Sequence, residues 1–576
     1  MIFNAVSILF LFVVFTGIGL LLPWSLFLKE RRFESLLICF WLGWAAAIAF
    51  LQLWHFFFPV GLGAFLVLFA FGVGGWALRR NAVAEMLRCW DRRQAVILGG
   101  LALIPCGMVA NHVLFNQPNS DYALYHLQTV KWISEYAIVP GLGNLFNPLA
   151  LNCSSFLYTA AIDSGLLEGR AFYVSNSLLA YVAMLYCAAG LYSLIQRKDV
   201  RNAHLFSALM IPAVLLQVST AYIVAYSPDP IVFFLQVVLA GEVLRLFEDE
   251  HDPDTFRRRA AQIALLAAAG ISLKLSFAVF GAVSMLFMAA VGIRRFQAWP
   301  WRSPRLWLGW AGIAAVIMVP WMVRSVILSG YLAFPNTLIS FPVEWKVPED
   351  LANEQQPVIR IWAQTVDASI EYTGDLAWLV RWWNTFPFNL RQSFYFTLIL
   401  AAFSIFLMAV LRRRARPDPG IAAVVVICAA SLVFWFFMAP SFRLSGAIFW
   451  ILLAAAVMFA FRLLTSAGVI TRPDLAAYAL VLVLSLWLSP NHFSNNLSRR
   501  LMIMPVPEQA RPEQALSRTN YRQMVTNHGL TVNIPPEGTE ECWDTPLPCT
   551  TPANFSQRLY LLNPGSLQDG LALDWD

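Results

Sequence analysis

The chain has 576 residues, of which 59% are hydrophobic and only 13% are charged, with a net charge of +6 and a mean hydropathy of +0.62. Soluble proteins carry about 25% charged residues, so this chain cannot cover itself with a hydrated surface. The composition excludes a soluble enzyme, a disordered chain and a disulfide-rich secreted scaffold, and it indicates no nucleic-acid partner. We therefore expect an all-α integral membrane protein in contact with the lipid bilayer.

Apolar runs long enough to cross about 30 Å of hydrocarbon recur along the chain. We predict about fourteen transmembrane helices, of which the eighth and ninth are short and separated by little more than Ser272-Leu273-Lys274. The predicted spans cover residues 4–28, 35–57, 61–78, 95–115, 171–195, 204–223, 229–247, 260–275, 276–293, 306–328, 394–411, 420–440, 444–462 and 474–490.

Clusters of Lys and Arg fall on alternate connections between these spans, and the positive-inside rule assigns such connections to the cytoplasm. Both termini and three long segments, 116–170, 329–393 and 491–576, then lie outside. The cytoplasmic connections are short and no GxxxxGK[ST] motif occurs, which disfavours an ATP-driven pump. We divide the chain into a three-span extension (1–94), a transmembrane core (95–490) and a small extracytoplasmic C-terminal module.

The segment 116–170 opens with a carboxylate, Asp121, directly after the fourth span. Asp121 is interpreted either as the N-cap of an interfacial helix that extends to about residue 138 or as a general base at the mouth of a cavity. Tyr122 and His126 share one face of such a helix. Asp121 and His126, five residues apart, would point roughly 140° apart on an α-helix. A second short helix is expected near 154–168.

Three cations are expected at the outer ends of spans: Lys274, Arg324 and Arg443. Together they would suit a lipid phosphate, because Arg provides a bidentate grip and Lys a point charge. The alternative is that Lys274 snorkels to the interface and that the arginines anchor their helices. Tyr331 follows Arg324 closely, in Ser329-Gly330-Tyr331.

Asp229 lies in Ser227-Pro228-Asp229-Pro230 between two spans and is interpreted either as a turn former or as a second carboxylate facing the same cavity as Asp121. A divalent cation is compatible with such a pair, but two carboxylates do not define a metal. The Trp- and Pro-rich segment 329–393 would suit either a carbohydrate groove or an interfacial aromatic belt.

The tail contains two strand-like runs, 530–534 and 559–562, and two cysteines seven residues apart, Cys542 and Cys549. In an oxidising compartment a disulfide between these cysteines is expected. The segment is too short for an enzyme domain, so we interpret it as a lid or stabilising module.

Several stretches together resemble a known superfamily. They are Asp121-Tyr122-Ala123-Leu124-Tyr125-His126, Val139-Pro140-Gly141-Leu142-Gly143-Asn144, Ser329-Gly330-Tyr331, Pro440-Ser441-Phe442-Arg443 and the Cys542…Cys549 tail. With the interfacial helices of the first outer loop, they look like the GT-C superfamily of polyprenyl-phosphate-dependent glycosyltransferases, and more closely like a bacterial multi-span family of this type. The resemblance covers about residues 100–576.

The resemblance implies a GT-C-like core and an inverting glycosyltransferase in the bacterial plasma membrane, with its active site facing the exterior. Its partners would be a polyprenyl-phosphate-linked sugar donor and a lipid-linked glycan or other extracytoplasmic acceptor. Asp121 is the expected base, and the expected substrate-binding residues are Tyr122, His126, Asp229, Lys274, Arg324, Tyr331 and Arg443. The alternatives are a glycan polymerase or ligase that uses pyrophosphate-linked oligosaccharides, and a flippase, which the apolar spans disfavour.

Overall fold

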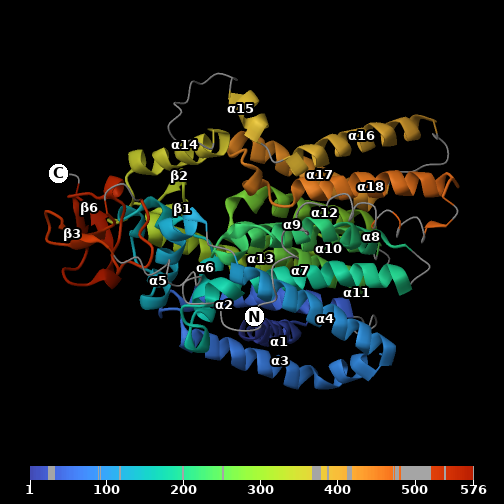
Figure 1. Cartoon of the computed structure of the whole chain (residues 1–576), viewed down its shortest axis with the longest axis horizontal. Helices are drawn as coiled ribbons and strands as arrows, with labels where there is room; N and C mark the ends of the chain where they lie inside the picture. The colour runs from blue at the N-terminus through green and yellow to red at the C-terminus, as the bar shows by residue number, and fades with distance from the viewer. Residues whose placement is uncertain are drawn as a thin grey trace.

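The computed structural model is a bundle of long helices with a small C-terminal module at one end (Figure 1). It describes residues 1–23, 33–88, 90, 92–115, 119–196, 200–248, 252–365, 378–385, 388–410, 418–470, 472–473, 479, 481, 520–536 and 540–574.

Within these residues, ten helical segments are long and apolar enough to cross a membrane. They are α1 (Ile2–Leu21), α2 (Phe33–Trp54), α3 (Leu62–Arg88), α4 (Arg92–His112), α7 (Ala171–Gln196), α10 (Pro228–Glu248), Leu275–Phe296, which contains α12 (Ala278–Phe296), α13 (Pro304–Ser329), α17 (Pro419–Met438) and α18 (Ile448–Ser466). The prediction of a helical multi-pass membrane protein is thereby confirmed.

The count of fourteen spans stays a prediction. The run predicted at 204–223 forms two short helices, α8 (Asn202–Leu209) and α9 (Ile211–Val218), which meet at Met210, and Pro212 lies in the first turn of α9. The run at 260–275 belongs to α11 (Pro253–Leu273), whose first turns are basic. The run at 394–411 lies in α16 (Phe388–Val410), and most of the run at 474–490 lies outside the described residues.

The first two helices pack into the main bundle, where they contact α7, α11 and α13. Glycines allow α1 and α2 to approach closely: a Cβ on Gly19 would lie 1.8 Å from the Cys39 carbonyl oxygen, and one on Gly43 would lie 1.9 Å from that of Phe15. Small residues permit such contacts between membrane helices. The division of the chain after residue 94 stays a prediction, but α1 and α2 share the buried core with the later helices.

Most of the non-spanning structure gathers at one end of the bundle, which we call the loop end (Figure 1). It contains a π-helical turn (Tyr122–His126), α5 (Leu127–Glu135) and α6 (Ser155–Ile162), which correspond to the two short helices predicted after the fourth span. It also holds β1 (Tyr331–Ala333), β2 (Asn336–Ser340), α14 (Glu349–Thr365) and α15 (Trp378–Thr385).

The C-terminal module is built from two antiparallel pairs, β3 (Arg522–Val525) with β4 (Thr531–Ile534) and β5 (Leu559–Leu561) with β6 (Leu571–Leu573). Cys542 and Cys549 form a disulfide, as predicted. The Trp543 N–H donates to the Ala123 carbonyl at 2.9 Å, and the Leu571 N–H donates to that of Pro140 at 2.9 Å. The module is therefore docked on the helix that begins near Asp121 and on the stretch that follows this helix.

The Val139-Pro140-Gly141-Leu142-Gly143-Asn144 stretch contacts several other segments of the loop end. Gly141 has a φ of +68°, and a Cβ there would lie 2.0 Å from the Leu571 carbonyl oxygen. The Asn144 side-chain amide donates to the Trp345 and Leu571 carbonyls at 2.9 and 3.1 Å. This stretch thus joins three segments of the loop end.

Candidate functional site

Four charged side chains that are distant in the sequence meet at the loop end: Asp121, Asp229, Lys274 and Arg443. Arg443 donates to both carboxylates, with Nη1 2.6 Å from Asp121 Oδ2 and Nε 3.2 Å from Asp229 Oδ2. Lys274 pairs with the other oxygen of Asp229. We call these four residues the charge cluster. It holds two positive and two negative charges and is therefore balanced.

Asp121 lies in the first turn of the interfacial helix, but its side chain does not cap that helix. The carboxylate points to Arg443 instead, and Asn119 donates to it at 3.4 Å. The N-cap interpretation is therefore wrong. The next residues form a π turn, in which the Leu127 N–H bonds to the Tyr122 carbonyl. Such i→i+5 turns are rare and frequent at functional sites.

The π turn changes which residues share a face. An i→i+5 turn brings residues five apart closer to the same side, and His126 lies near enough to the charge cluster for the charges of Asp121, Asp229, Lys274 and Arg443 to act on its pKa. Burial nevertheless lowers the pKa of His126 to about 4, against the opposing effect of the two carboxylates. His126 is therefore neutral near pH 7.

Asp229 lies in the first turn of α10, which begins at Pro228. The Ser227-Pro228-Asp229-Pro230 stretch is therefore the start of a helix and not a separate turn. A carboxylate is favoured there because the helix N-terminus carries a partial positive charge. The Asn176 side chain holds the preceding backbone by donating to the Ala225 and Ser227 carbonyls at 2.7 and 3.0 Å. Asp229 therefore faces the same site as Asp121, as one of the two interpretations predicted.

Lys274 and Arg443 both lie in short non-α-helical connections between two helices. Lys274 is an extended residue between α11 and a 3-10 turn, Leu275–Phe277. Arg443 lies in another 3-10 turn, Phe442–Ser445, between α17 and α18. The Gln236 side chain of α10 accepts from the Ala447 N–H at 2.7 Å and so anchors the segment that carries Arg443.

Sequence reasoning did not identify Gln236 as a site residue. Its signal is a polar residue in an apolar span, two helical turns after Asp229 and thus on the same face. Tyr222 and Tyr125 were also missed. Arg443 lies over the Tyr222 ring, 5.5 Å from its centroid. Burial first, and then the charge of Asp121, raises the pKa of the Tyr125 phenol well above its ordinary value.

The members of the charge cluster differ in exposure. The Asp229 side chain is 6% exposed, whereas those of Asp121, Lys274 and Arg443 are 23%, 26% and 30% exposed. Asp121 is therefore the carboxylate that an entering molecule can reach. Asp229 is the buried counter-ion of both cations.

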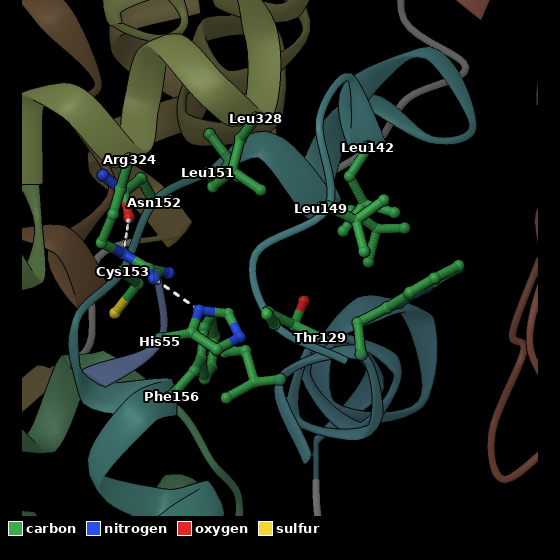
Figure 2. Close-up of a pocket in the computed structure, with 14 residues that line it drawn as sticks. His55, Thr129, Leu142, Leu149, Leu151, Asn152, Cys153, Phe156, Arg324 and Leu328 are labelled. Carbon is green, nitrogen blue, oxygen red and sulfur yellow. Dashed lines mark hydrogen bonds between the residues drawn. The ribbon is translucent and has the colours of Figure 1, made fainter. Parts of the chain in front are cut away.

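Three of the predicted binding residues lie elsewhere. Tyr122 packs on Tyr226, with ring centroids 5.0 Å apart. The Tyr331 hydroxyl donates to the Val347 carbonyl at 2.9 Å, which makes it part of the loop-end core. Arg324 does not join the other two cations, because its guanidinium is turned toward His55 at the end of α2 (Figure 2).

Two expectations for the loop end remain open. Among the described residues no group of three or more Cys, His, Asp and Glu gathers to hold a metal ion, and Arg443 lies between the two carboxylates. Part of the Trp-rich segment 329–393 lies outside the described residues. The Trp382 indole donates to the Pro440 carbonyl beside Arg443, which gives this tryptophan a supporting role.

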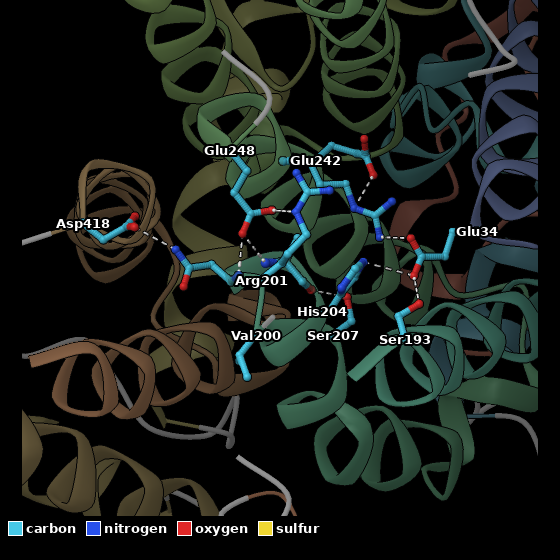
Figure 3. A network of polar contacts seen from close by, with 12 residues as sticks. Glu34, Ser193, Val200, Arg201, His204, Ser207, Glu242, Glu248 and Asp418 are labelled. Carbon is cyan, nitrogen blue, oxygen red and sulfur yellow. Dashed lines mark hydrogen bonds and ion pairs between the residues drawn. The ribbon is translucent and has the colours of Figure 1, made fainter. Parts of the chain in front are cut away.

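A second charged network lies at the other end of α10 (Figure 3). Arg245 Nη2 lies 3.1 Å from Glu34 Oε2, and Arg259 Nη1 lies 3.0 Å from Glu242 Oε2. His204 lies 3.4 Å from Glu34. These charges are balanced by one another and join α2, α8, α10 and α11, so we interpret the network as structural.

The fold and the charge cluster define a multi-pass helical membrane protein with a polar site at the loop end. A family model described as "Domain of unknown function (DUF8201)" matches residues 1–450. The chain belongs to this family. The matched residues include all four members of the charge cluster and Arg324. Neither a search of curated proteins nor a search of solved structures gives a match.

Proposed function

We propose that this protein is an inverting glycosyltransferase of GT-C type that uses a polyprenyl-phosphate-linked sugar as donor. The observation that carries the proposal is the bridging of Asp121 and Asp229 by Arg443, with Lys274 as the second cation. Such a site offers a carboxylate and a pair of cations within reach of one another at the end of apolar helices. A sugar carried on a lipid phosphate needs both.

Binding of the donor would replace one of the ion pairs within the charge cluster. A phosphate that approaches Arg443 and Lys274 competes with the carboxylates for the same N–H groups. Asp121 is the more exposed carboxylate, so it is the one displaced, while Asp229 remains as a buried counter-ion. The displaced Asp121 then accepts a proton from the acceptor hydroxyl.

The proposed transfer forms one bond and breaks one bond at the anomeric carbon of the sugar. The acceptor oxygen attacks the anomeric carbon as the bond from that carbon to the phosphate oxygen breaks. The proton of the acceptor hydroxyl passes to Asp121, and the electron pair of the broken bond leaves with the polyprenyl phosphate. Lys274 and Arg443 stabilise the negative charge that develops on this leaving group, which is where fixed cations accelerate such a step. Attack from the face opposite the leaving group inverts the configuration.

The sidedness of the site is part of the proposal. The alternation of basic clusters along the sequence supports, by the positive-inside rule, a loop end that faces the outside of a bacterial plasma membrane. A lipid-linked donor is expected there, because nucleotide sugars are not available outside the cell. Single cysteines introduced at Glu349 or Asn554 should be labelled from outside intact cells, and one at Arg258 only after permeabilisation.

Donor turnover tests the proposed activity directly. The purified protein would be reconstituted in liposomes with a panel of radiolabelled sugars on polyprenyl phosphate and a membrane-lipid extract as acceptor. We expect free polyprenyl phosphate and a labelled product from at least one donor, and neither from the Asp121→Asn variant. Consumption of polyprenyl-pyrophosphate-linked oligosaccharides alone would instead support a polymerase or ligase.

A further inference from the structure

A second site lies around Arg324, near the end of α13. Its side chain lines a small, partly open pocket (Figure 2). Arg324 is only 3% exposed. Nη1 lies 2.5 Å from His55 Nδ1, and Nε donates to Asn152 Oδ1 at 3.3 Å. We call this the Arg324 pocket.

Both partners of Arg324 are neutral. His55 Nε2 lies 3.1 Å from the Tyr136 carbonyl oxygen, so Nε2 carries the proton and Nδ1 is left to accept from Arg324. Burial first, and then the charge of Arg324, lowers the pKa of His55 well below its ordinary value, which keeps the ring neutral. The Asn152 amide is fixed by a 2.6 Å bond to the Trp321 carbonyl.

Arg324 therefore carries a charge that its neighbours do not balance. In the part of the chain that the structure describes, no carboxylate lies within ion-pair distance of it, and Nη2 has no acceptor. A buried, unbalanced charge is unfavourable unless an opposite charge reaches it. In the charge cluster, by contrast, each cation faces a carboxylate.

The remaining walls of the pocket are mainly apolar. Leucines at positions 142, 149, 151 and 328 line it together with aromatic side chains. The pocket is also close to the charge cluster: Thr129, which lines the pocket, lies one turn beyond Tyr125, and its hydroxyl donates to the Tyr125 carbonyl at 2.8 Å. Asp121 of the charge cluster and Thr129 of the Arg324 pocket therefore lie about two turns apart on one interfacial helix.

We infer that the Arg324 pocket binds the oxyanionic headgroup, phosphate or carboxylate, of an amphiphile whose apolar part lies against the leucines. Arg324 supplies the charge and free N–H groups, and His55 and Asn152 hold the guanidinium in place. The site is separate from the charge cluster and does not depend on sugar transfer. A failure of the proposed glycosyltransferase activity would leave this inference intact.

Binding of short, water-soluble amphiphiles tests the inference. Hexyl phosphate and hexanoate would be titrated by calorimetry into the protein in phosphatidylcholine nanodiscs, with empty nanodiscs as blank and hexanol and inorganic phosphate as comparisons. We expect saturable binding of at least one amphiphile, tighter than that of inorganic phosphate, and none of hexanol. The headgroup that binds more tightly shows which oxyanion the pocket prefers. Absence of saturable binding, or equal affinity for inorganic phosphate, would overturn the inference.

Two variants localise the binding, after melting curves have shown that each is folded. Arg324→Gln should weaken it about 10- to 100-fold, since it removes charge-assisted hydrogen bonds. Leu151→Trp fills the pocket without changing its charge and should weaken it as well. Arg443→Gln is the matched control and should leave this binding in place. The inference is wrong if Arg324→Gln retains the affinity, or if Arg443→Gln abolishes all binding.

Discussion

Arg443 Nη1 lies 2.6 Å from Asp121 Oδ2, although the two residues are 322 positions apart in the chain. The same guanidinium also reaches Asp229. Burial alone would lower the pKa of Arg443, but the charges of Asp229 and Asp121 raise it above its ordinary value. Arg443 therefore remains a cation, and the carboxylate we propose as the base is held in an ion pair until another anion replaces it.

Asp121→Asn should abolish sugar transfer and leave the protein folded. The amide keeps the size of the side chain and still accepts a hydrogen bond from Arg443, but it cannot take up the acceptor proton. General-base catalysis is worth about 10²- to 10⁴-fold, so initial rates in the liposome assay should fall by at least about 100-fold. Asp254→Asn, a change at an exposed surface carboxylate, is the control. A loss smaller than tenfold would assign Asp121 to structure alone.

Arg443→Lys and Arg443→Gln should separate charge from bridging geometry. Lysine keeps the charge but lacks the planar fork that reaches both carboxylates, whereas glutamine loses the charge. We expect the KM for the lipid donor to rise about 10- to 100-fold for glutamine and less for lysine. The KM for the acceptor should change little. Equal effects on both substrates would indicate that Arg443 supports the fold rather than the donor phosphate.

Stability should depend on pH through His126. Its folded-state pKa is about 4, below the unfolded value near 6.5, so the unfolded chain binds a proton more readily. The contribution of this residue is fully present above about pH 6.5 and is lost as the pH falls toward 4, by at most about 3 kcal/mol. His55 acts in the same direction. Melting temperatures measured across this range should fall less steeply for His126→Gln than for the parent, and an unchanged slope would contradict the prediction.

The disulfide should stabilise the C-terminal module where it covers the interfacial helix. Closing a loop of this length removes chain entropy from the unfolded state and contributes about 2–3 kcal/mol. In the double variant Cys542→Ser, Cys549→Ser we expect faster hydrogen exchange at Ala123–Gln128, because Trp543 and Thr545 accept or donate hydrogen bonds there. Cys187→Ser, at a free buried cysteine, is the control. Unchanged exchange would show that the docking does not need the bridge.

Much of the fold could be predicted because a bilayer requires long apolar helices. The interruption at Lys274 could be predicted as well, because a charged residue between two apolar runs is unfavourable in a bilayer. The division of the run at 204–223 at Met210, just before Pro212, was not predicted, because we judged that run by hydropathy alone. Span counting also depends on residues 474–490, most of which lie outside the described part.

The candidate site was predictable only in part. Asp121, Lys274 and Arg443 could be selected because charged residues at the ends of apolar runs need partners. Their pairing depends on how distant helices pack, which one sequence does not show. The π turn after Asp121 could not be anticipated from α-helical spacing, which separates Asp121 and His126 by roughly 140° although His126 was selected as a site residue. Arg324 was grouped with the other cations because nothing marked His55 as its partner.

The central claim is that a lipid phosphate displaces Asp121 from Arg443. A cryo-EM structure of the protein in nanodiscs with added polyprenyl phosphate would test this most directly. We expect the phosphate within hydrogen-bond distance of both Lys274 and Arg443, with the Asp121 carboxylate released toward the acceptor side and Asp229 still in place. A bound polyprenyl phosphate that contacts neither cation, with the pair between Asp121 and Arg443 intact, would contradict the account.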